Sequence, residues 1–194
     1  MVHIAKFDRD TVVRSAMALF WQKGFGGTST RDLQQAVNMH PGSIYAAFGN
    51  KAGLYREALD CYAATMAGEL LAQVERQGSF VAGFKAFVRQ ALFDASQAAS
   101  AETCMLVKAR MELDGKQDEL YEHAGLHLQR LEQLFTRLLE DDRQRGTLIE
   151  STPVVELARY LQIQFMGLRS YRACGGGDAA IEKVIERLFT GYEA

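Results

Sequence analysis

Pro41 and Pro153 are the only prolines in this sequence, and turn dipeptides of the Asn-Gly or Asp-Pro kind are almost absent. A many-stranded sheet would lack its hairpin turns in such a chain. With 48% hydrophobic and 24% charged residues, the sequence is too apolar for a disordered chain and too charged for a membrane bundle. We therefore expect a globular all-α fold.

Apolar residues recur at helical spacing along the chain and predict about nine helices. The expected ranges are 8–23, about 30–37, 41–47, 51–77, 80–96, 103–112, 117–145, 153–173 and 178–192. Ser29 and Asp32 form a capping-box signature at the start of the second helix. Asn38 tolerates the left-handed conformation of a tight turn, and Pro41 suits the first position of the third helix.

The net charge of −2 would by itself argue against a nucleic-acid partner, but charge has to be counted by segment. Residues 1–60 hold seven Lys and Arg against five Asp and Glu, whereas residues 61–194 hold fifteen against nineteen. The first segment is therefore weakly basic. Specific docking on DNA needs a few placed cations rather than a strongly basic domain.

Cysteine usage and hydropathy point to the cytoplasm. Cys61, Cys104 and Cys174 are an odd number at irregular spacing, which fits reduced thiols better than a disulfide framework or a zinc ligand set. No apolar run has the length of a membrane-spanning helix, and the first 20 residues show no signal-peptide pattern. We expect no membrane partner.

Residues 29–48 have the pattern of a helix-turn-helix, in which two short helices follow a longer one. The second short helix of this motif can lie in the major groove of DNA, so its outer face should be polar and small. His40, Pro41, Gly42 and Ser43 have that character. Thr30 and Arg31 begin the first short helix with a hydroxyl and a cation, which favour a phosphate oxygen, and Lys51 repeats this arrangement at the next long helix.

Several short motifs carry a family resemblance. They are Ala16 to Phe20, Lys23-Gly24-Phe25, Thr28 to Leu33, Gly42-Ser43-Ile44-Tyr45 with Phe48, and Asn50 to Tyr55. Over about residues 6–60 the chain resembles the amino-terminal domain of TetR/AcrR bacterial transcriptional regulators. The resemblance implies a DNA-binding domain at 6–60 and a ligand-sensing and dimerisation domain at 61–194. It also implies a homodimeric repressor that binds a palindromic operator and is released by a small-molecule effector.

The resemblance also assigns roles by position. Thr30, Tyr45 and Lys51 would hold phosphates, while Arg31, Pro41, Gly42 and Ser43 would lie nearest the bases. Arg31 is the expected guanine contact, because a guanidinium pairs bidentately with O6 and N7. Ser29 and His40 complete the expected interface, and Ala46 offers apolar contact with thymine methyl groups.

The last two helices, within about 153–192, are expected to pair with their copies in a homodimer. The apolar residues that suggest this are Leu157, Tyr160, Leu161, Phe165, Leu168, Tyr171, Ile181, Ile185, Leu188 and Phe189. A second set of apolar residues with a few polar groups is a candidate effector pocket, although such a set also occurs as plain core. This set is Tyr62, Met66, Phe84, Phe87, Cys104, Met105, Lys108 and Phe165.

Helical spacing brings two further groups of residues close together. Cys104 lies one turn before Lys108, which would suit a reactive thiolate that senses oxidants or electrophiles, but a buried inert thiol is the simpler interpretation. His123 and His127 lie at i and i+4 and can chelate, but Glu119 and His127 are about 12 Å apart along the helix, so a third ligand must come from elsewhere. We therefore expect no metal and no cofactor.

Catalysis is not expected, because the sequence has no nucleophile elbow, phosphate loop or dinucleotide fingerprint. The alternatives to a DNA-binding repressor are a helical protein-interaction module without DNA binding, or an activator or redox-sensing regulator that acts through Cys104. The effector, the operator sequence and the regulated genes do not follow from the sequence.

Overall fold

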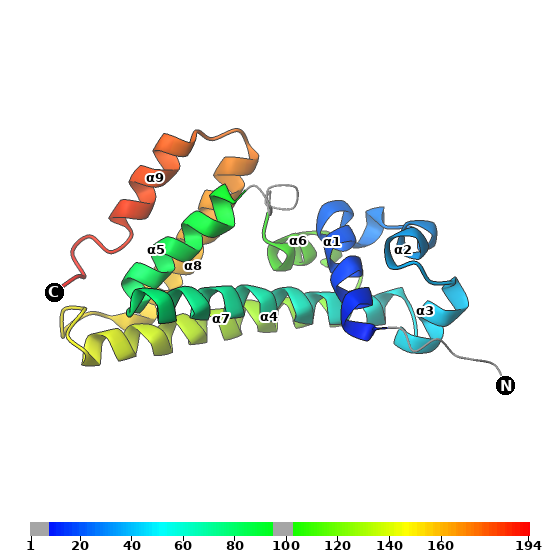
Figure 1. Cartoon of the computed structure of the whole chain (residues 1–194), viewed down its shortest axis with the longest axis horizontal. Helices are drawn as coiled ribbons and strands as arrows, with labels where there is room; N and C mark the ends of the chain where they lie inside the picture. The colour runs from blue at the N-terminus through cyan, green and yellow to red at the C-terminus, as the bar shows by residue number, and fades with distance from the viewer. Residues whose placement is uncertain (1–7, 95–102) are drawn as a thin grey trace. The chain divides into compact units, whose positions relative to one another are not determined.

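The computed structural model describes residues 8–94 and 103–194, and within these ranges the chain forms nine α-helices (Figure 1). They are α1 (Arg9–Gly27), α2 (Thr30–Val37), α3 (Pro41–Phe48), α4 (Lys51–Gln77), α5 (Phe80–Phe93), α6 (Met105–Leu113), α7 (Asp118–Gln144), α8 (Val154–Ala173) and α9 (Asp178–Arg187). The β-structure of the described residues is limited to an isolated bridge between Leu148 and Glu193. The predicted all-α fold is therefore confirmed.

Local capping chemistry sets the ends of the first helices. Asp8 caps α1, since its side chain accepts a hydrogen bond from the Asp10 amide. At Gly24 the backbone takes a φ of 76°, so the predicted helix stop is a kink, after which a further helical turn continues to Gly27. The Thr28 hydroxyl donates to the Gly24 carbonyl over 2.7 Å and closes this turn.

The short helices α2 and α3 follow the predicted signals. Ser29 and Asp32 form the expected reciprocal capping box at the start of α2. Asn38 ends α2 in the left-handed conformation with a φ of 50° and a ψ of 44°. Pro41 occupies the first turn of α3, where its missing N–H has no helical partner to lose.

Two predicted helix ends were wrong, and one prediction reaches outside the described residues. Helix α9 ends at Arg187 rather than at residue 192, because residues 188–192 form tight turns. In addition, the Ile149 amide donates a hydrogen bond to the Tyr192 carbonyl. Helix α6 begins at Met105, two residues after the predicted start. Helix α5 ends at Phe93 with Asp94 as its C-cap, and the predicted end near Ser96 lies outside the described residues.

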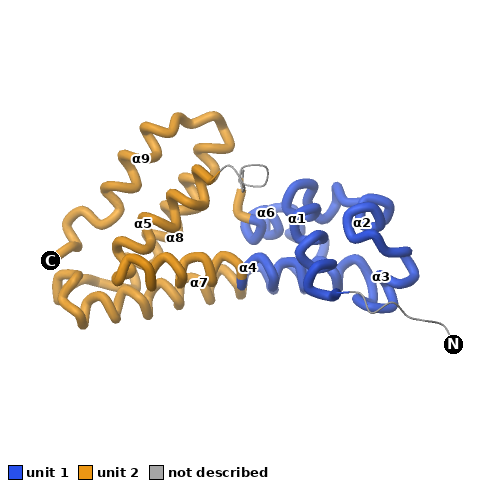
Figure 2. The backbone as a smooth tube through the Cα atoms, viewed as in Figure 1, with its two compact units in different colours: residues 1–64, 105–125 blue, residues 65–104, 126–194 orange. Residues whose placement is uncertain are grey.

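The chain divides into two compact units, residues 1–64 with 105–125 and residues 65–104 with 126–194 (Figure 2). In the first unit α1 packs against α2 and α6, and α2 packs against α3. Its core includes Phe20 and Tyr55, whose rings meet edge to face at 4.8 Å. The segment 105–125 thus groups with the amino-terminal helices, although it lies beyond the predicted domain boundary at residue 60.

The second unit has an aromatic core of its own, in which α5 packs against α8 and α9. Phe80 and Phe84 of α5 lie against Phe135 of α7 and against Phe189, with ring centroids 5.2 to 6.3 Å apart. All four side chains are fully buried. No helix in the described part of the chain is both long and apolar enough to cross a membrane.

Candidate nucleic-acid interface

Helices α2 and α3 present one face to the core of the first unit and another to solvent. Leu33, Ile44 and Phe48 are buried, as expected for the inner face of the motif. The predicted contact residues on the outer face are exposed or half-buried. The exposed ones are Ser29, Arg31, His40, Gly42, Ser43 and Ala46, and the half-buried ones are Thr30, Pro41, Tyr45 and Lys51. The segment therefore offers a continuous surface to a partner.

Thr30 and Tyr45 come together on this surface. The Thr30 hydroxyl lies 3.0 Å from the Tyr45 hydroxyl, so the first turn of α2 is linked to the middle of α3. Each hydroxyl keeps the capacity for a further hydrogen bond, because one donor–acceptor contact does not saturate it. This pair, together with the backbone amides that begin α2, forms a polar site suited to a phosphate oxygen.

Lys51 begins α4 and lies beside the aromatic ring of Phe25. Its Nζ is 4.5 Å from the ring centroid, a cation–π distance. Partial burial lowers the pKa of the Lys51 ammonium, and the negative charge of Glu112 opposes that shift. Packing against the ring restricts the positions that the ammonium can reach. A restrained ammonium is better suited to bind one particular phosphate than the ammonium of a freely moving surface lysine.

Arg31 lies at the edge of an open surface hollow of about 350 Å³. Its walls are Arg31, Gln34, Gln35, Asn38, Met39 and His40. Arg31 and His40 were predicted from the sequence, whereas Gln34 and Gln35, whose amides can pair bidentately with adenine, were not. Their positions three and four residues after Arg31 on the same short helix would have been the signal to include them.

Arg9 holds α3 against the neighbouring helices of the first unit. Its guanidinium donates to the Ala47 carbonyl and to the Glu57 carboxylate, and it lies over the Phe48 ring at 4.4 Å. These contacts act on the carboxyl end of α3, where the carbonyl groups have no helical donors. The arginine therefore fixes the orientation of α3 without lying on its outer face.

Helix α6 supports the carboxyl end of α1 through two side chains one turn apart. Lys108 Nζ donates to the carbonyls of Trp21 and Gln22 over 3.0 and 2.9 Å. The Glu112 carboxylate accepts hydrogen bonds from the amides of Phe25 and Gly26. Together they satisfy backbone groups that the Gly24 kink leaves without helical partners.

The predicted effector-pocket residues lie in the cores of both units. Seven of the eight are buried, and these are Tyr62, Met66, Phe84, Phe87, Cys104, Met105 and Phe165. Within the second unit, Phe87 contacts both Phe84 and Phe165, with ring centroids 6.3 and 5.1 Å apart. Lys108 is half-buried and directs its ammonium to the α1 carbonyls described above. Cys104 is buried and Cys174 is exposed, and neither of them forms a disulfide bond.

The prediction that ten apolar residues of the last two helices lie on the surface and pair with a second copy was wrong for most of them. Eight of the ten are buried inside the chain, because α8 and α9 pack on α5 and on each other. The exceptions are Tyr160 and Tyr171, which stay 38% and 51% exposed. Val155 and Ile163 are exposed on the same helix, so α8 does carry an apolar surface, formed by other residues than those predicted.

Comparisons with known proteins agree with this architecture. Residues 12–58 match the family described as bacterial regulatory proteins, tetR family. The HTH-type transcriptional repressor ComR of Escherichia coli is 44% identical over 68 residues, which cover 35% of this chain and 32% of ComR. The match thus spans about a third of that relative. An uncharacterized HTH-type transcriptional regulator of Bacillus subtilis, YezE, is 25% identical over 157 residues, 80% of this chain and 81% of YezE.

Solved structures extend the similarity to nearly the whole chain. A cysteine-substituted form of the TetR family transcriptional regulator CifR, complexed with 26-bp double-strand operator DNA, has a TM-score of 0.85 and 25% identity over 98% of this chain and 100% of CifR. A TetR family transcriptional regulator from Cytophaga hutchinsonii has a TM-score of 0.83 and 23% identity over 100% and 99% of the two chains. The second likeness concerns the fold alone.

Proposed function

We propose that this chain, whose residues 12–58 match the bacterial regulatory proteins of the tetR family, is a DNA-binding transcriptional repressor of that family that acts in the cytoplasm and is not an enzyme. The observation that carries the proposal is the exposed outer face of α2 and α3, with the Thr30 and Tyr45 hydroxyls joined at one edge. CifR, which has the same fold, was solved with operator DNA, and ComR is named a repressor.

Phosphate contacts position the protein on the duplex. Thr30 and Tyr45 bind one phosphate together, and Lys51 binds another with an ammonium that the Phe25 ring holds in place. The capping residue Ser29 sets the direction of the α2 amides toward the backbone of the DNA.

Base contacts come from the outer face of α3 and from the hollow beside it. Arg31 reads a guanine through O6 and N7. His40, Pro41, Gly42 and Ser43 allow close approach to the base edges, and Ala46 meets a thymine methyl group. Gln34 and Gln35 join this group as candidates for adenine, since they line the same hollow as Arg31.

The repressor acts as a homodimer through the last two helices, because a helix-turn-helix reader of a palindrome needs two copies about 34 to 36 Å apart. The apolar residues that α8 leaves exposed form the contact, and Gly167 on the same helix has open space around its Cα. A small-molecule effector that binds within the carboxy-terminal domain shifts the population from the DNA-binding state to the non-binding state, so that the operator is released. Its identity is to be found by screening.

Electrophoretic retardation with the DNA upstream of the protein's own gene tests the proposal. We expect saturable, sequence-dependent binding whose log affinity falls linearly with log salt concentration. Arg31→Ala should cost about 1 to 3 kcal/mol and relax the preference at one base position, whereas Lys51→Ala should weaken all sequences alike. Binding that does not discriminate operator from scrambled DNA would instead favour a helical protein-interaction module.

A further inference from the structure

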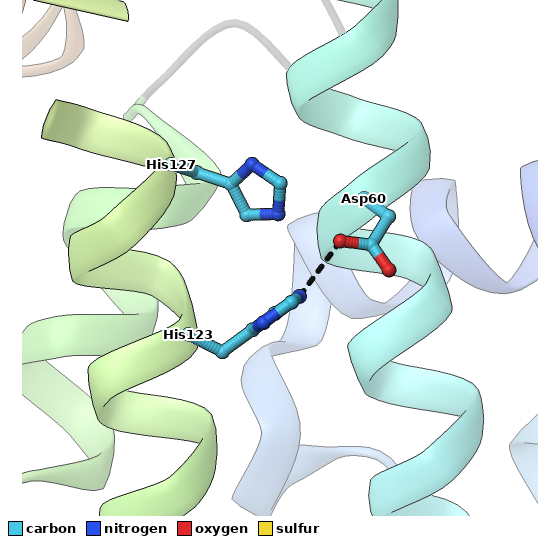
Figure 3. Close-up of side chains that lie close together, drawn as sticks. All are labelled: Asp60, His123 and His127. Atoms are coloured by element: carbon cyan, nitrogen blue, oxygen red, sulfur yellow. Dashed lines mark hydrogen bonds and ion pairs between the residues drawn. The ribbon is translucent and has the colours of Figure 1, made fainter. Parts of the chain in front are cut away.

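Three potential metal ligands approach one another where α4 and α7 run side by side (Figure 3). Asp60 comes from α4, and His123 and His127 come from α7. The ligand atoms of all three lie within 4.8 Å of one another, and the His123 Nε2 is 2.7 Å from Asp60 Oδ1. The His123 side chain is 12% exposed and the Asp60 side chain 48% exposed, so the cluster is set into the protein but reachable from solvent.

Helix geometry brings the two imidazoles together, since residues at i and i+4 lie on one face of a helix. What the sequence left open was the third ligand. Glu119, one turn before His123, does not supply it, because its carboxylate pairs with Arg56 at 2.6 Å. Asp60 supplies it from the neighbouring helix, and no pattern in the sequence links residue 60 to residues 123 and 127.

The donor set selects a class of ion. Two imidazole nitrogens and one carboxylate oxygen suit Zn²⁺ and other first-row divalent ions, whereas Mg²⁺ and Ca²⁺ prefer oxygen ligands throughout. Bonds of about 2.0 to 2.1 Å in a tetrahedral site place neighbouring donors roughly 3.4 Å apart. The present separations, from 2.7 Å to no more than 4.8 Å, bracket that value, so side-chain rotations suffice to close the site.

We propose that Asp60, His123 and His127 form a binding site for a divalent transition-metal ion of the Zn²⁺ type. The three side chains supply three ligands, and water takes the fourth position on the side that Asp60 leaves open to solvent. In the metal-free state the Asp60–His123 hydrogen bond holds both side chains near their ligating positions, which lowers the entropic cost of assembling the site.

Metal titration of the full-length, tag-free protein tests the site. After treatment with a chelator, the protein is titrated with Zn²⁺ in the presence of a chromophoric competitor, and we expect one ion per chain. Asp60→Asn, His123→Gln and His127→Gln should each weaken binding by at least about 100-fold, because loss of an outer-sphere partner alone costs about 10- to 100-fold. Glu119→Gln is the matched control, and its affinity should equal that of the unmodified protein.

A second readout does not depend on the variants. Co²⁺ bound by two imidazoles, a carboxylate and water should give the visible absorption of a tetrahedral site in the unmodified protein. Circular dichroism of each metal-free variant checks that it folds, since His127 is only 9% exposed. Absence of stoichiometric Zn²⁺ binding, or a Glu119→Gln variant as weak as Asp60→Asn, overturns the assignment, whatever the affinity for operator DNA.

Discussion

The contact between Thr30 and Tyr45 is the smallest unit of the proposed interface that can be tested. Tyr45→Phe removes one hydroxyl and keeps the ring, so the packing of α3 should survive. A hydrogen bond to a charged group such as a phosphate is worth about 1.5 to 3 kcal/mol, which corresponds to roughly a 10- to 150-fold loss of affinity. Because the contact is to phosphate, operator and unrelated DNA should lose affinity by a similar factor in retardation assays.

The paired variant Thr30→Val completes a double-mutant cycle for this contact. If the two hydroxyls bind one phosphate together, the effects of the single variants should not add. Additive losses, or a loss confined to one operator position, would contradict a shared phosphate site.

Asp32 should make the folding stability of the amino-terminal unit depend on pH in the acidic range. The Lys23 ammonium, 2.6 Å away, and the Ser29 hydroxyl hold the pKa of the Asp32 carboxyl well below its usual range. A depressed pKa adds stability above the unfolded value of about 3.9, and this stability is lost as the pH falls below about 4. The urea midpoint should therefore fall more steeply between pH 5 and pH 3 for the natural protein than for Asp32→Asn.

The comparison needs a control for the general effect of removing a carboxylate. Asp141→Asn changes an exposed carboxylate on α7 in the second unit and should leave the steepness unchanged. Equal acid sensitivity of Asp32→Asn and the natural protein would show that the Lys23 and Ser29 contacts do not stabilise the fold.

At the scale of elements, α6 acts on the end of α1 through the Glu112 carboxylate. Glu112→Ala leaves the amides of Phe25 and Gly26 without this acceptor, and each unsatisfied buried donor costs about 1 to 3 kcal/mol. Since Gly26 is exposed and water can replace its bond, we expect a total loss of about 1 to 3 kcal/mol by urea unfolding. Glu112→Gln keeps one oxygen acceptor and should therefore lose less stability than Glu112→Ala. Equal losses of stability in the two variants would show that the negative charge, and not the hydrogen bonds, is responsible.

Gly53, in the first turn of α4, lies too close to the carboxyl end of α3 for any larger residue. A Cβ built at this position would lie 2.1 Å from the Phe48 carbonyl oxygen, an impossible contact with backbone. Gly53→Ala should therefore shift the carboxyl end of α3, lower stability and weaken operator binding together. Thermal unfolding and operator retardation measure both effects. Gly68→Ala on the same helix is the control, because its Cβ would meet no atom within 4 Å, and it should be neutral or slightly stabilising.

The starts of helices were predictable where one local feature, such as a capping side chain or a proline ring, determines them. Ser29, Pro41 and Lys51 mark the starts of α2, α3 and α4 as expected. The end of α9 was not predictable, because the bridge between Leu148 and Glu193 depends on residues far apart in the sequence. The same distinction separates His123 and His127, paired by helix spacing, from Asp60, which only tertiary packing brings beside them.

For the whole molecule, burial within one chain decides which residues remain for a partner. Amphipathic patterning identified the apolar stripes of α8 and α9 but not which residues the chain itself covers, so most of the predicted dimer residues are core. Val155, Tyr160, Ile163 and Tyr171 are the large apolar side chains that α8 leaves more than a third exposed. The dimer assignment therefore has to be tested on these residues.

Ile163→Glu places a charge on the exposed apolar surface of α8, where Ile163 is 56% exposed. Desolvating that carboxylate at an apolar contact costs several kcal/mol, so sedimentation should show a monomer for this variant and the proposed dimer for the natural protein. The isolated chain should stay folded, because Ile163 contributes little to its core. Operator affinity should then fall steeply, since a monomer reads one half-site. Met111→Glu, which changes a 79% exposed residue of α6, is the matched control and should remain dimeric. If the Ile163→Glu variant is also a dimer, the interface lies on another surface.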